Sequence, residues 1–135
     1  MIEELKKIHS NSYAPISNFS VSACVVTNDG KKFYGVNVED ISTRAGVCAE
    51  RNAMFAAITA GYKKGDFKEC HVMVSDGSVG TPCFVCRQMI SELFSNDAII
   101  YCYSIKGEVK KYTVKELCPY PFESDDLKWN VDLLV

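Results

Sequence analysis

The chain has 135 residues, of which 47% are hydrophobic and 24% charged, and its formal net charge is −2. This balance is typical of a soluble globular protein, and the length suits a single domain over residues 1–135. The lysines are spread along the chain without a basic face, so we expect no nucleic-acid polymer as a partner. No apolar run is long enough to cross a membrane, and the first residues predict an amphipathic helix rather than a signal peptide. We therefore expect a cytoplasmic protein with no membrane partner.

The first part of the chain predicts a helix followed by a hairpin. Apolar residues at helical spacing among lysines and glutamates predict a helix over about residues 2–12. The run over 19–27 predicts a strand, and Asn28-Asp29-Gly30-Lys31 is a typical hairpin turn. Residues 33–38 would then form the returning strand.

Helical and extended segments alternate in the remainder. In chain order we expect a helix over 49–60, a strand over 70–75, a helix over 84–94, strands over 98–103 and 109–113, and a helical turn over 113–117. This order predicts an α/β protein, a three-layer α/β/α sandwich with one mixed five-stranded sheet and helices on both faces.

Seven cysteines, an odd number in a chain without a secretory signal, do not favour a disulfide framework. Cys83 and Cys86 are separated by two residues, and Cys48 lies far upstream. Zinc prefers thiolates, and a catalytic zinc takes three protein ligands and keeps a fourth position for water or substrate. These three cysteines therefore predict an open zinc site. We expect the other four to be free thiols, largely small buried hydrophobes: Cys24, Cys70, Cys102 and Cys118.

Glu50 lies two residues after Cys48, close enough to reach a metal-bound water without being a ligand itself. A Cys-x-Glu segment followed by Pro-Cys-x-x-Cys is the pattern of zinc deaminases, in which the glutamate moves protons. All these parts occur here in that order, which is far more specific than a single Cys-x-x-Cys.

Arginines follow both ligand segments. The net charge of Zn²⁺ with three thiolate ligands is −1. This negative charge alone would make the metal less able to lower the pKa of a bound water. Arg51 and Arg87, together with the N-termini of the two predicted helices, can draw charge from the sulfur atoms. The alternative for either arginine is a solvated surface charge.

Taken together, these segments resemble the small, homotetrameric, three-cysteine cytidine deaminases over nearly the whole chain. The resemblance is carried by Tyr13-Ala14-Pro15 with Phe19, by Gly35 to Glu39, by Cys48 to Arg51, by Pro82 to Gln88, and by Glu116 to Phe122.

The resemblance implies a mechanism and a cofactor. One Zn²⁺ per chain would be held by Cys48, Cys83 and Cys86, and a zinc-bound hydroxide would attack C4 of cytosine. Glu50 would protonate N3 and shuttle protons to the leaving amine. The implied function is hydrolytic deamination of cytidine and deoxycytidine, in pyrimidine salvage.

The resemblance also implies how a nucleoside is held. Asn37 and Glu39 would bind the ribose hydroxyls, Phe19 would pack beside the base, and the Ala49 amide would meet the base carbonyl. Phe122 would enter the site of a neighbouring subunit, in a homo-oligomer that is expected to be a tetramer with shared active sites. The residues alone favour a polar strand end facing water for Asn37 and Glu39, and the two phenylalanines could be core aromatics.

Two departures from the family pattern concern the expected pocket. Thr43 stands where an aromatic residue is common, and Phe84-Val85 replace the usual Gly and Ala between the late cysteines. One alternative is therefore a blasticidin S deaminase-like enzyme, acting on another aminopyrimidine nucleoside. Cys48 follows Asn37 by eleven positions, a separation that resembles the cytidine enzymes instead. A different class would be a structural zinc-binding interaction module with Cys70 as fourth ligand, but it gives Glu50 no role.

Overall fold

The fold was obtained as a computed structural model that describes residues 1–123. The elements in chain order are α1 (Ile2–His9), β1 (Val21–Thr27), β2 (Lys32–Val36), α2 (Ala49–Thr59), β3 (Phe67–Val74), α3 (Phe84–Leu93), β4 (Phe94–Ser104), β5 (Val109–Thr113) and α4 (Val114–Leu117). The predicted single domain extends to residue 135 and thus partly outside the described residues.

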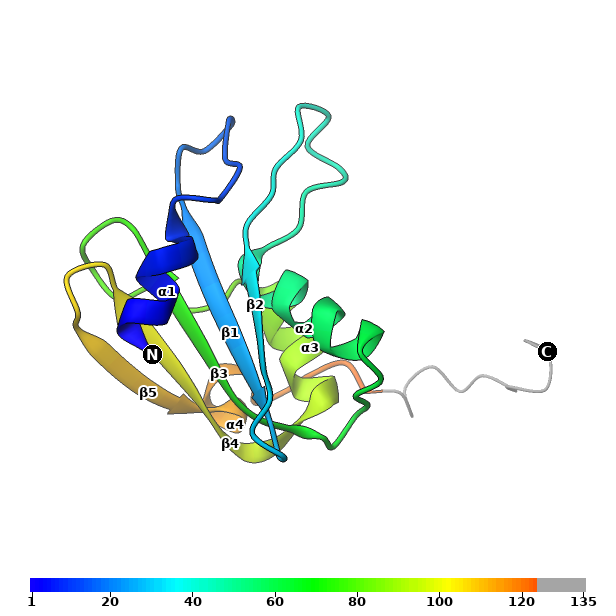
Figure 1. The fold of residues 1–135 in the computed structure, drawn as a ribbon. Helices are drawn as coiled ribbons and strands as arrows, with labels where there is room; N and C mark the ends of the chain where they lie inside the picture. The colour runs from blue at the N-terminus through cyan, green and yellow to red at the C-terminus, as the bar shows by residue number, and fades with distance from the viewer. Residues whose placement is uncertain (124–135) are drawn as a thin grey trace.

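The five strands form one mixed sheet in the order β2-β1-β3-β4-β5. The central pair β3 and β4 is parallel, with α3 in the connection between them, and the other neighbouring pairs are antiparallel. Helix α1 lies on one face of the sheet, and α2 and α3 lie on the other (Figure 1). This confirms the predicted three-layer arrangement.

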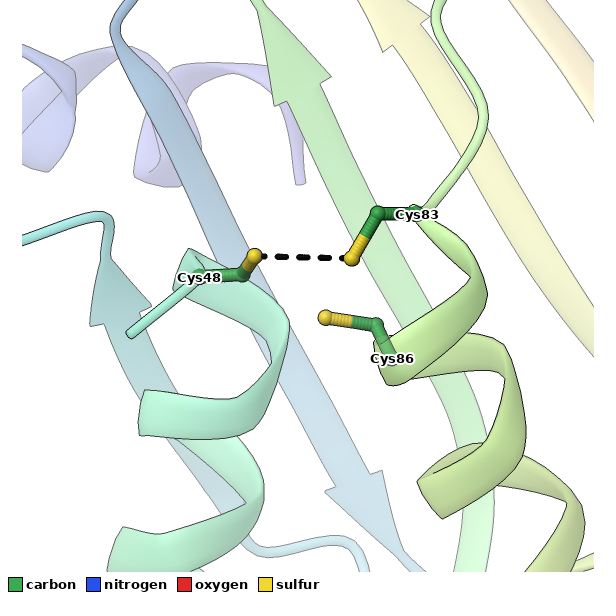
Figure 2. A group of neighbouring side chains, drawn as sticks. All are labelled: Cys48, Cys83 and Cys86. Carbon is green, nitrogen blue, oxygen red and sulfur yellow. Dashed lines mark hydrogen bonds between the residues drawn. The ribbon is translucent and has the colours of Figure 1, made fainter. Parts of the chain in front are cut away.

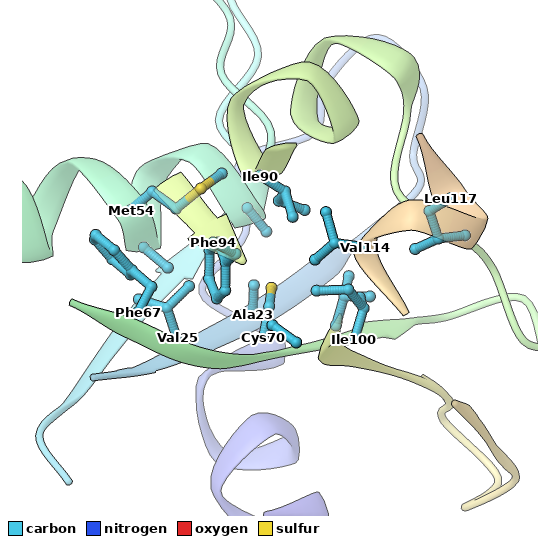
Figure 3. Packing of buried hydrophobic residues seen from close by; sticks show 14 of the residues in the cluster. Ala23, Val25, Met54, Phe67, Cys70, Ile90, Phe94, Ile100, Val114 and Leu117 are labelled. Carbon is cyan, nitrogen blue, oxygen red and sulfur yellow. The ribbon is translucent and has the colours of Figure 1, made fainter. Parts of the chain in front are cut away.

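The main hydrophobic core lies between the sheet and α2, α3 and α4. Small and medium side chains dominate it, and Figure 3 shows Met54 of α2 and Ile90 of α3 on the side of the sheet that the two helices cover. A second, smaller cluster packs Leu5 of α1 against Cys24, Met73 and Tyr103 on the opposite face. Because helices cover both faces of the sheet, β1 and the part of β3 from Cys70 onward are almost continuously buried.

Helix α2 lies unusually close to β2. A Cβ atom on Gly35 would lie 2.5 Å from the backbone nitrogen of Ala53, so any larger residue at this strand position would push the helix away. Ala49, Ala53 and Ala57 are fully buried in the same helix. The small residues thus bring the first turn of α2, which follows Cys48, close to the sheet.

Two long segments rise together from the end of the sheet, residues 10–20 and 37–47 (Figure 1). Tyr13 bridges to Val38, and Val38 also bridges to Val47. These backbone bridges connect the two segments to each other above the first turn of α2. There the two segments line a cavity, which is described below.

Element boundaries differ from the sequence prediction by three or more residues in three places, and by one or two residues in others. Helix α1 ends at His9 rather than near residue 12, because the chain turns so that Tyr13 can pair with Val38. Strand β3 begins at Phe67 rather than 70, and β4 at Phe94 rather than 98, where these two phenylalanines pair with each other. Polar residues 95–97 had the composition of a loop, yet they continue the strand with exposed side chains.

Candidate functional site

Three cysteine side chains meet between the first turns of α2 and α3. Cys48 is the N-cap of α2, Cys83 is the N-cap of α3, and Cys86 lies in the first turn of α3. Their Sγ atoms lie within 4.8 Å of one another, and Figure 2 shows all three directed toward a common point. Within residues 1–123 this is the one group of cysteine, histidine and acidic side chains with the spacing of a metal site.

The sulfur geometry fits zinc. The Sγ atoms of Cys48 and Cys83 are 3.5 Å apart. Two thiolates that bind zinc at about 2.3 Å with a tetrahedral angle would lie about 3.8 Å apart. The predicted fourth ligand of a structural site, Cys70, is fully buried in the main core and is not part of the group.

The three thiols cannot all ionise without a cation. The pKa of Cys83 is lowered to about 2, because the thiols of Cys48 and Cys86 donate hydrogen bonds to its sulfur. The same interactions raise the pKa of Cys48 and of Cys86. One negative charge is therefore shared among three sulfur atoms, and a divalent cation would allow the other two thiols to lose their protons.

The two predicted arginines differ in what they contact. The Arg51 guanidinium donates to Cys48 Sγ at 3.5 Å, so it reaches a sulfur directly. Arg87 instead donates to the carbonyl oxygens of Pro82 and Leu117, at 2.7 and 3.1 Å, and to Thr81 Oγ1 at 2.7 Å. Arg87 therefore holds the loop that leads into Cys83.

Glu50 is buried in the first turn of α2, with only 4% of its surface exposed. Burial raises its pKa to about 7, and the nearby Cys83 thiolate acts in the same direction. A carboxyl group with a pKa near neutrality can both accept and donate a proton under ordinary conditions. This is the property that a proton shuttle requires.

Glu50, Cys48 and Cys83 line one cavity of about 470 Å³. This volume is within the range of small-molecule sites. The other lining residues come from the two long segments, from the first residues of β1 and α2, from β3 and from the loop before α3: Ile16, Ser17, Phe19, Val21, Asn37, Val38, Glu39, Asp40, Thr43, Gly46, Val47, Ala49, Val72, Val74 and Thr81. The structure thus brings together Phe19, Asn37, Glu39 and Ala49, the predicted substrate-binding residues of this chain.

Asn37 and Glu39 already have partners inside the chain. Asn37 accepts a hydrogen bond from the Val21 N–H and donates to the Phe19 carbonyl, both at 2.8 Å. One oxygen of Glu39 accepts from the N–H groups of Ile16 and Ser17 at 3.0 Å, and the other accepts from the Ser17 hydroxyl at 2.5 Å.

These bonds tie the wall of the cavity together. The hydroxyl and N–H of Ser17 hold the pKa of Glu39 below its usual range, so the carboxylate remains charged. Sequence reasoning missed Ser17, because no spacing rule links it to a glutamate 22 positions away. It also missed Val72 and Val74, which lie in a strand that has the composition of ordinary core.

Three other predicted positions lie outside the cavity. Phe122 is 55% exposed and is not among the lining residues, so it is not a core aromatic of its own chain. Phe84 and Val85, which we expected near the pocket, are 75% and 59% exposed and do not line it either. Of the departures from the family pattern, only Thr43 lines the cavity, with a left-handed backbone at φ 62°.

Comparison with known proteins places this geometry in a family. Residues 1–102 match the family model of the cytidine and deoxycytidylate deaminase zinc-binding region. The chain belongs to this family. It is 33% identical to a cytidine deaminase of Sporosarcina psychrophila over 129 residues, which cover 96% of this chain and 93% of the relative.

Solved structures and a second type of relative agree with the assignment. A crystal structure of cytidine deaminase from Burkholderia pseudomallei is 40% identical, with a TM-score of 0.85, over 90% of this chain and 95% of that one. A blasticidin-S deaminase of Bacillus cereus is 29% identical over 108 residues, or 76% of each chain. The protein is therefore a hydrolytic deaminase with zinc as its cofactor. No helix within residues 1–123 is long and apolar enough to cross a membrane.

Proposed function

We propose that this enzyme deaminates cytidine and deoxycytidine to uridine and deoxyuridine, as part of pyrimidine salvage in the cytoplasm. The observation that carries the proposal is the position of Glu50. A buried carboxyl group with a pKa of about 7 shares a cavity of nucleoside size with two of three clustered cysteines. A structural zinc module would have no use for such a group.

Cys48, Cys83 and Cys86 would hold the zinc ion, one per chain. Bound zinc supplies an activated water as the nucleophile near neutral pH. Arg51 would draw negative charge from Cys48 through its hydrogen bond, which counters the net charge of three thiolates. Arg87 would act less directly, by fixing the loop before Cys83.

Glu50 would carry the protons of the reaction. Its carboxylate accepts a proton from the attacking water, and its carboxyl form donates that proton to N3 of the base. A second proton then passes to the exocyclic amine, which leaves as ammonia. Water and cytidine thus give uridine and ammonia, and Glu50 returns to its starting state.

The remaining predicted residues would hold the nucleoside. Phe19, at the cavity wall, would pack against the base, and the Ala49 N–H would bond its carbonyl. Glu39 and Asn37 would accept hydrogen bonds from the ribose hydroxyls through lone pairs not used by their present partners. Binding would then share these side chains with Ser17 and Val21 rather than displace them.

The charge of the cavity favours a nucleoside over a nucleotide or a polymer. Its lining includes the acids Glu39, Asp40 and Glu50, but no lysine or arginine among the described residues. A 5′-phosphate would meet negative charge there, with no cation to bind it. The cavity therefore supports unphosphorylated substrates and argues against nucleic acid as a partner.

The assay is direct. The zinc-loaded enzyme is incubated with cytidine, deoxycytidine, cytidine monophosphate and blasticidin S, and the absorbance change on deamination is followed. We expect both nucleosides to be consumed, with kcat/KM at least about tenfold above that of the monophosphate. Faster turnover of blasticidin S would favour the alternative enzyme, and turnover of none of the four would contradict the proposal.

We propose further that the enzyme is a homotetramer with shared sites, in which Phe122 enters the cavity of a neighbouring chain. Its exposed ring, outside its own cavity, supports this placement. Phe55 and Ile58 of α2 are also about 40% exposed, which suits a contact between copies.

A mixed-oligomer experiment tests this placement. Phe122→Ala and Glu50→Gln chains are each impaired alone, and they are refolded together. Recovery of activity is expected, because an intact Glu50 can then meet an intact Phe122 from another chain. No recovery in confirmed mixed oligomers would contradict the shared site.

A further inference from the structure

One side chain of α3 holds the backbone of Phe122 from both sides. Gln88 lies two positions after Cys86, and its Nε2 donates to the Phe122 carbonyl at 2.5 Å. Its Oε1 accepts from the Phe122 N–H at 2.9 Å. These are the two bonds that a paired residue receives in an antiparallel sheet, so they fix both the position and the rotation of this residue.

The neighbouring residue holds the other end of the same segment. Arg87 donates to the carbonyl of Leu117, the last residue of α4, and to the Pro82 carbonyl just before Cys83. Two consecutive side chains of α3, Arg87 and Gln88, therefore hydrogen-bond to the two ends of the segment 117–122.

Within residues 1–123, the Phe122 side chain belongs to neither hydrophobic core cluster. The backbone is fixed by two hydrogen bonds, whereas 55% of the residue's surface is exposed. Phe122 lines a hollow with polar residues of α3 such as Ser91 and Glu92, and this hollow shares no lining residue with the cavity that contains Glu50. A held backbone with an exposed ring is the arrangement expected for a side chain that is presented to another molecule.

The chemistry of residue 88 matches this task. An amide both donates and accepts, so glutamine can satisfy the N–H and the carbonyl of one residue together. A carboxylate would only accept and an ammonium would only donate. Gln88 is half-buried, and the orientation of its amide is set by both bonds at once.

We propose that Gln88 is a positioning residue that fixes Phe122 for the cavity of the neighbouring chain. This inference rests on the proposed function, in which Phe122 enters that cavity. It adds a physical link: the helix that carries Cys83 and Cys86 in one chain sets the aromatic wall of the site in the next. The effect of Gln88 on substrate binding should therefore pass entirely through the Phe122 ring.

A double-mutant cycle in the zinc-loaded, full-length oligomer tests this link. Gln88→Met keeps the length of the side chain and removes both hydrogen bonds. Because the Phe122 backbone then loses two of its hydrogen bonds and the ring is held less firmly, we expect KM for cytidine to rise about 3- to 10-fold. The change in kcat should be smaller, and zinc should remain at one per chain. In a Phe122→Ala background, Gln88→Met should cause no further rise in KM.

A second measurement does not depend on activity. Hydrogen exchange of the backbone amides in 118–123 should become faster in Gln88→Met, because the Phe122 N–H loses its acceptor. Gln88→Glu keeps an acceptor for the Phe122 N–H but cannot donate to the Phe122 carbonyl. Its amide exchange rate and its KM should therefore lie between those of the wild type and those of Gln88→Met. Ser91→Ala is the matched control, since its hydroxyl bonds only the Gln88 carbonyl within α3, at 2.6 Å, and it should leave KM unchanged.

The outcomes separate the two proposals. An unchanged KM in Gln88→Met, together with a raised KM in Phe122→Ala, would overturn the positioning role and leave the shared site intact. Equal effects of Gln88→Met in both backgrounds would also overturn it, because Gln88 would then act by another route. A wild-type KM in Phe122→Ala would instead reject the shared site itself, and with it the link.

Discussion

Cys83 is the most exposed member of the cysteine cluster and carries the thiolate that its two neighbours hydrogen-bond. Removing it would leave only two of the three sulfur ligands that could hold the ion. Cys83→Ala should therefore reduce zinc to well below one per chain and lower the affinity of what remains by several orders of magnitude. Metal analysis after dialysis against a chelator measures this.

Cys70→Ala is the matched control for that experiment. Cys70 is fully buried in the core, so its loss should lower the free energy of unfolding by about 1 kcal/mol through a small void, with zinc retained. Zinc loss in Cys70→Ala, or full zinc retention in Cys83→Ala, would contradict the assigned ligand set.

The carboxyl group of Glu50 is tested by an isosteric amide. Glu50→Gln keeps the volume of the buried side chain but cannot take up a proton, so kcat should fall by about 10⁴-fold or more. Zinc content and thermal stability should stay near wild type. Glu92→Gln, an exposed carboxylate on α3, is the control and should retain full activity. Zinc loss in Glu50→Gln would instead assign Glu50 a structural role.

Residues whose roles follow from local spacing could be predicted from the sequence. Cys48 and Glu50 are two positions apart, and Cys83 and Cys86 lie on one helical turn, so their patterns are visible in the chain. Gln88 and Phe122 are 34 positions apart, and their contact depends on where α4 ends. No spacing rule predicts this contact, because it forms only in the tertiary structure.

At the scale of elements, the position of α2 depends on a strand glycine. Gly35→Ala would place a methyl group against the backbone of Ala49 and Ala53, and backbone atoms cannot yield as a flexible side chain can. We expect the free energy of unfolding in urea to fall by about 1–3 kcal/mol. Since Cys48 is the N-cap of α2, the shift of the helix should also weaken zinc binding.

Gly30→Ala separates the two effects. Its Cβ would meet open space, but its φ of 86° is in the left-handed region. The substitution should lower the unfolding free energy by about 1–2 kcal/mol without changing zinc affinity. If Gly35→Ala also kept wild-type zinc affinity, the first turn of α2 would have to be held by something other than β2.

The elements were predictable where hydrophobic periodicity is strong, and less so at their ends. Helices α2 and α3 match the expected ranges closely, since α2 is rich in small apolar residues, α3 has apolar residues at helical spacing, and each begins directly after a cysteine. The start of β4 was missed because Ser95, Asn96 and Asp97 are polar, and exposed polar residues do not reveal that the backbone is still extended. Pairing with β3, which is a tertiary contact, decides that boundary.

At the scale of the whole molecule, the two faces of the sheet differ in what they carry. The face toward α2 and α3 holds the cysteines and the main core, whereas α1 closes the opposite face. The order of helices and strands was enough to predict this layering. It could not predict that the end of α1 is pinned by a buried histidine, because His9 and Ser22 are 13 positions apart.

His9 makes the stability of the whole fold depend on pH. Its Nδ1 lies 2.9 Å from Ser22 Oγ, while its Nε2 is buried and has no hydrogen-bond partner among residues 1–123. Burial therefore lowers the pKa of His9 below the value of about 6.5 for an exposed histidine. Burial also lowers the pKa of His71, but Glu69 at 3.0 Å from its Nε2 opposes that shift.

The sign of the effect follows from proton uptake. Below pH 6.5 His9 binds a proton in the unfolded chain but stays neutral in the folded chain. The contribution of neutral His9 to the stability is therefore complete above that pH, and it is lost as the pH falls toward the lowered pKa of the folded state. His9→Asn keeps a polar atom near Ser22 and does not titrate. Urea unfolding of both proteins at pH 7.5 and 5.5 gives the test, because the acid-induced loss of zinc affects them equally and cancels in the difference. The wild type should lose more unfolding free energy between the two pH values than His9→Asn, and equal losses would show that His9 is not protonated in the unfolded state alone.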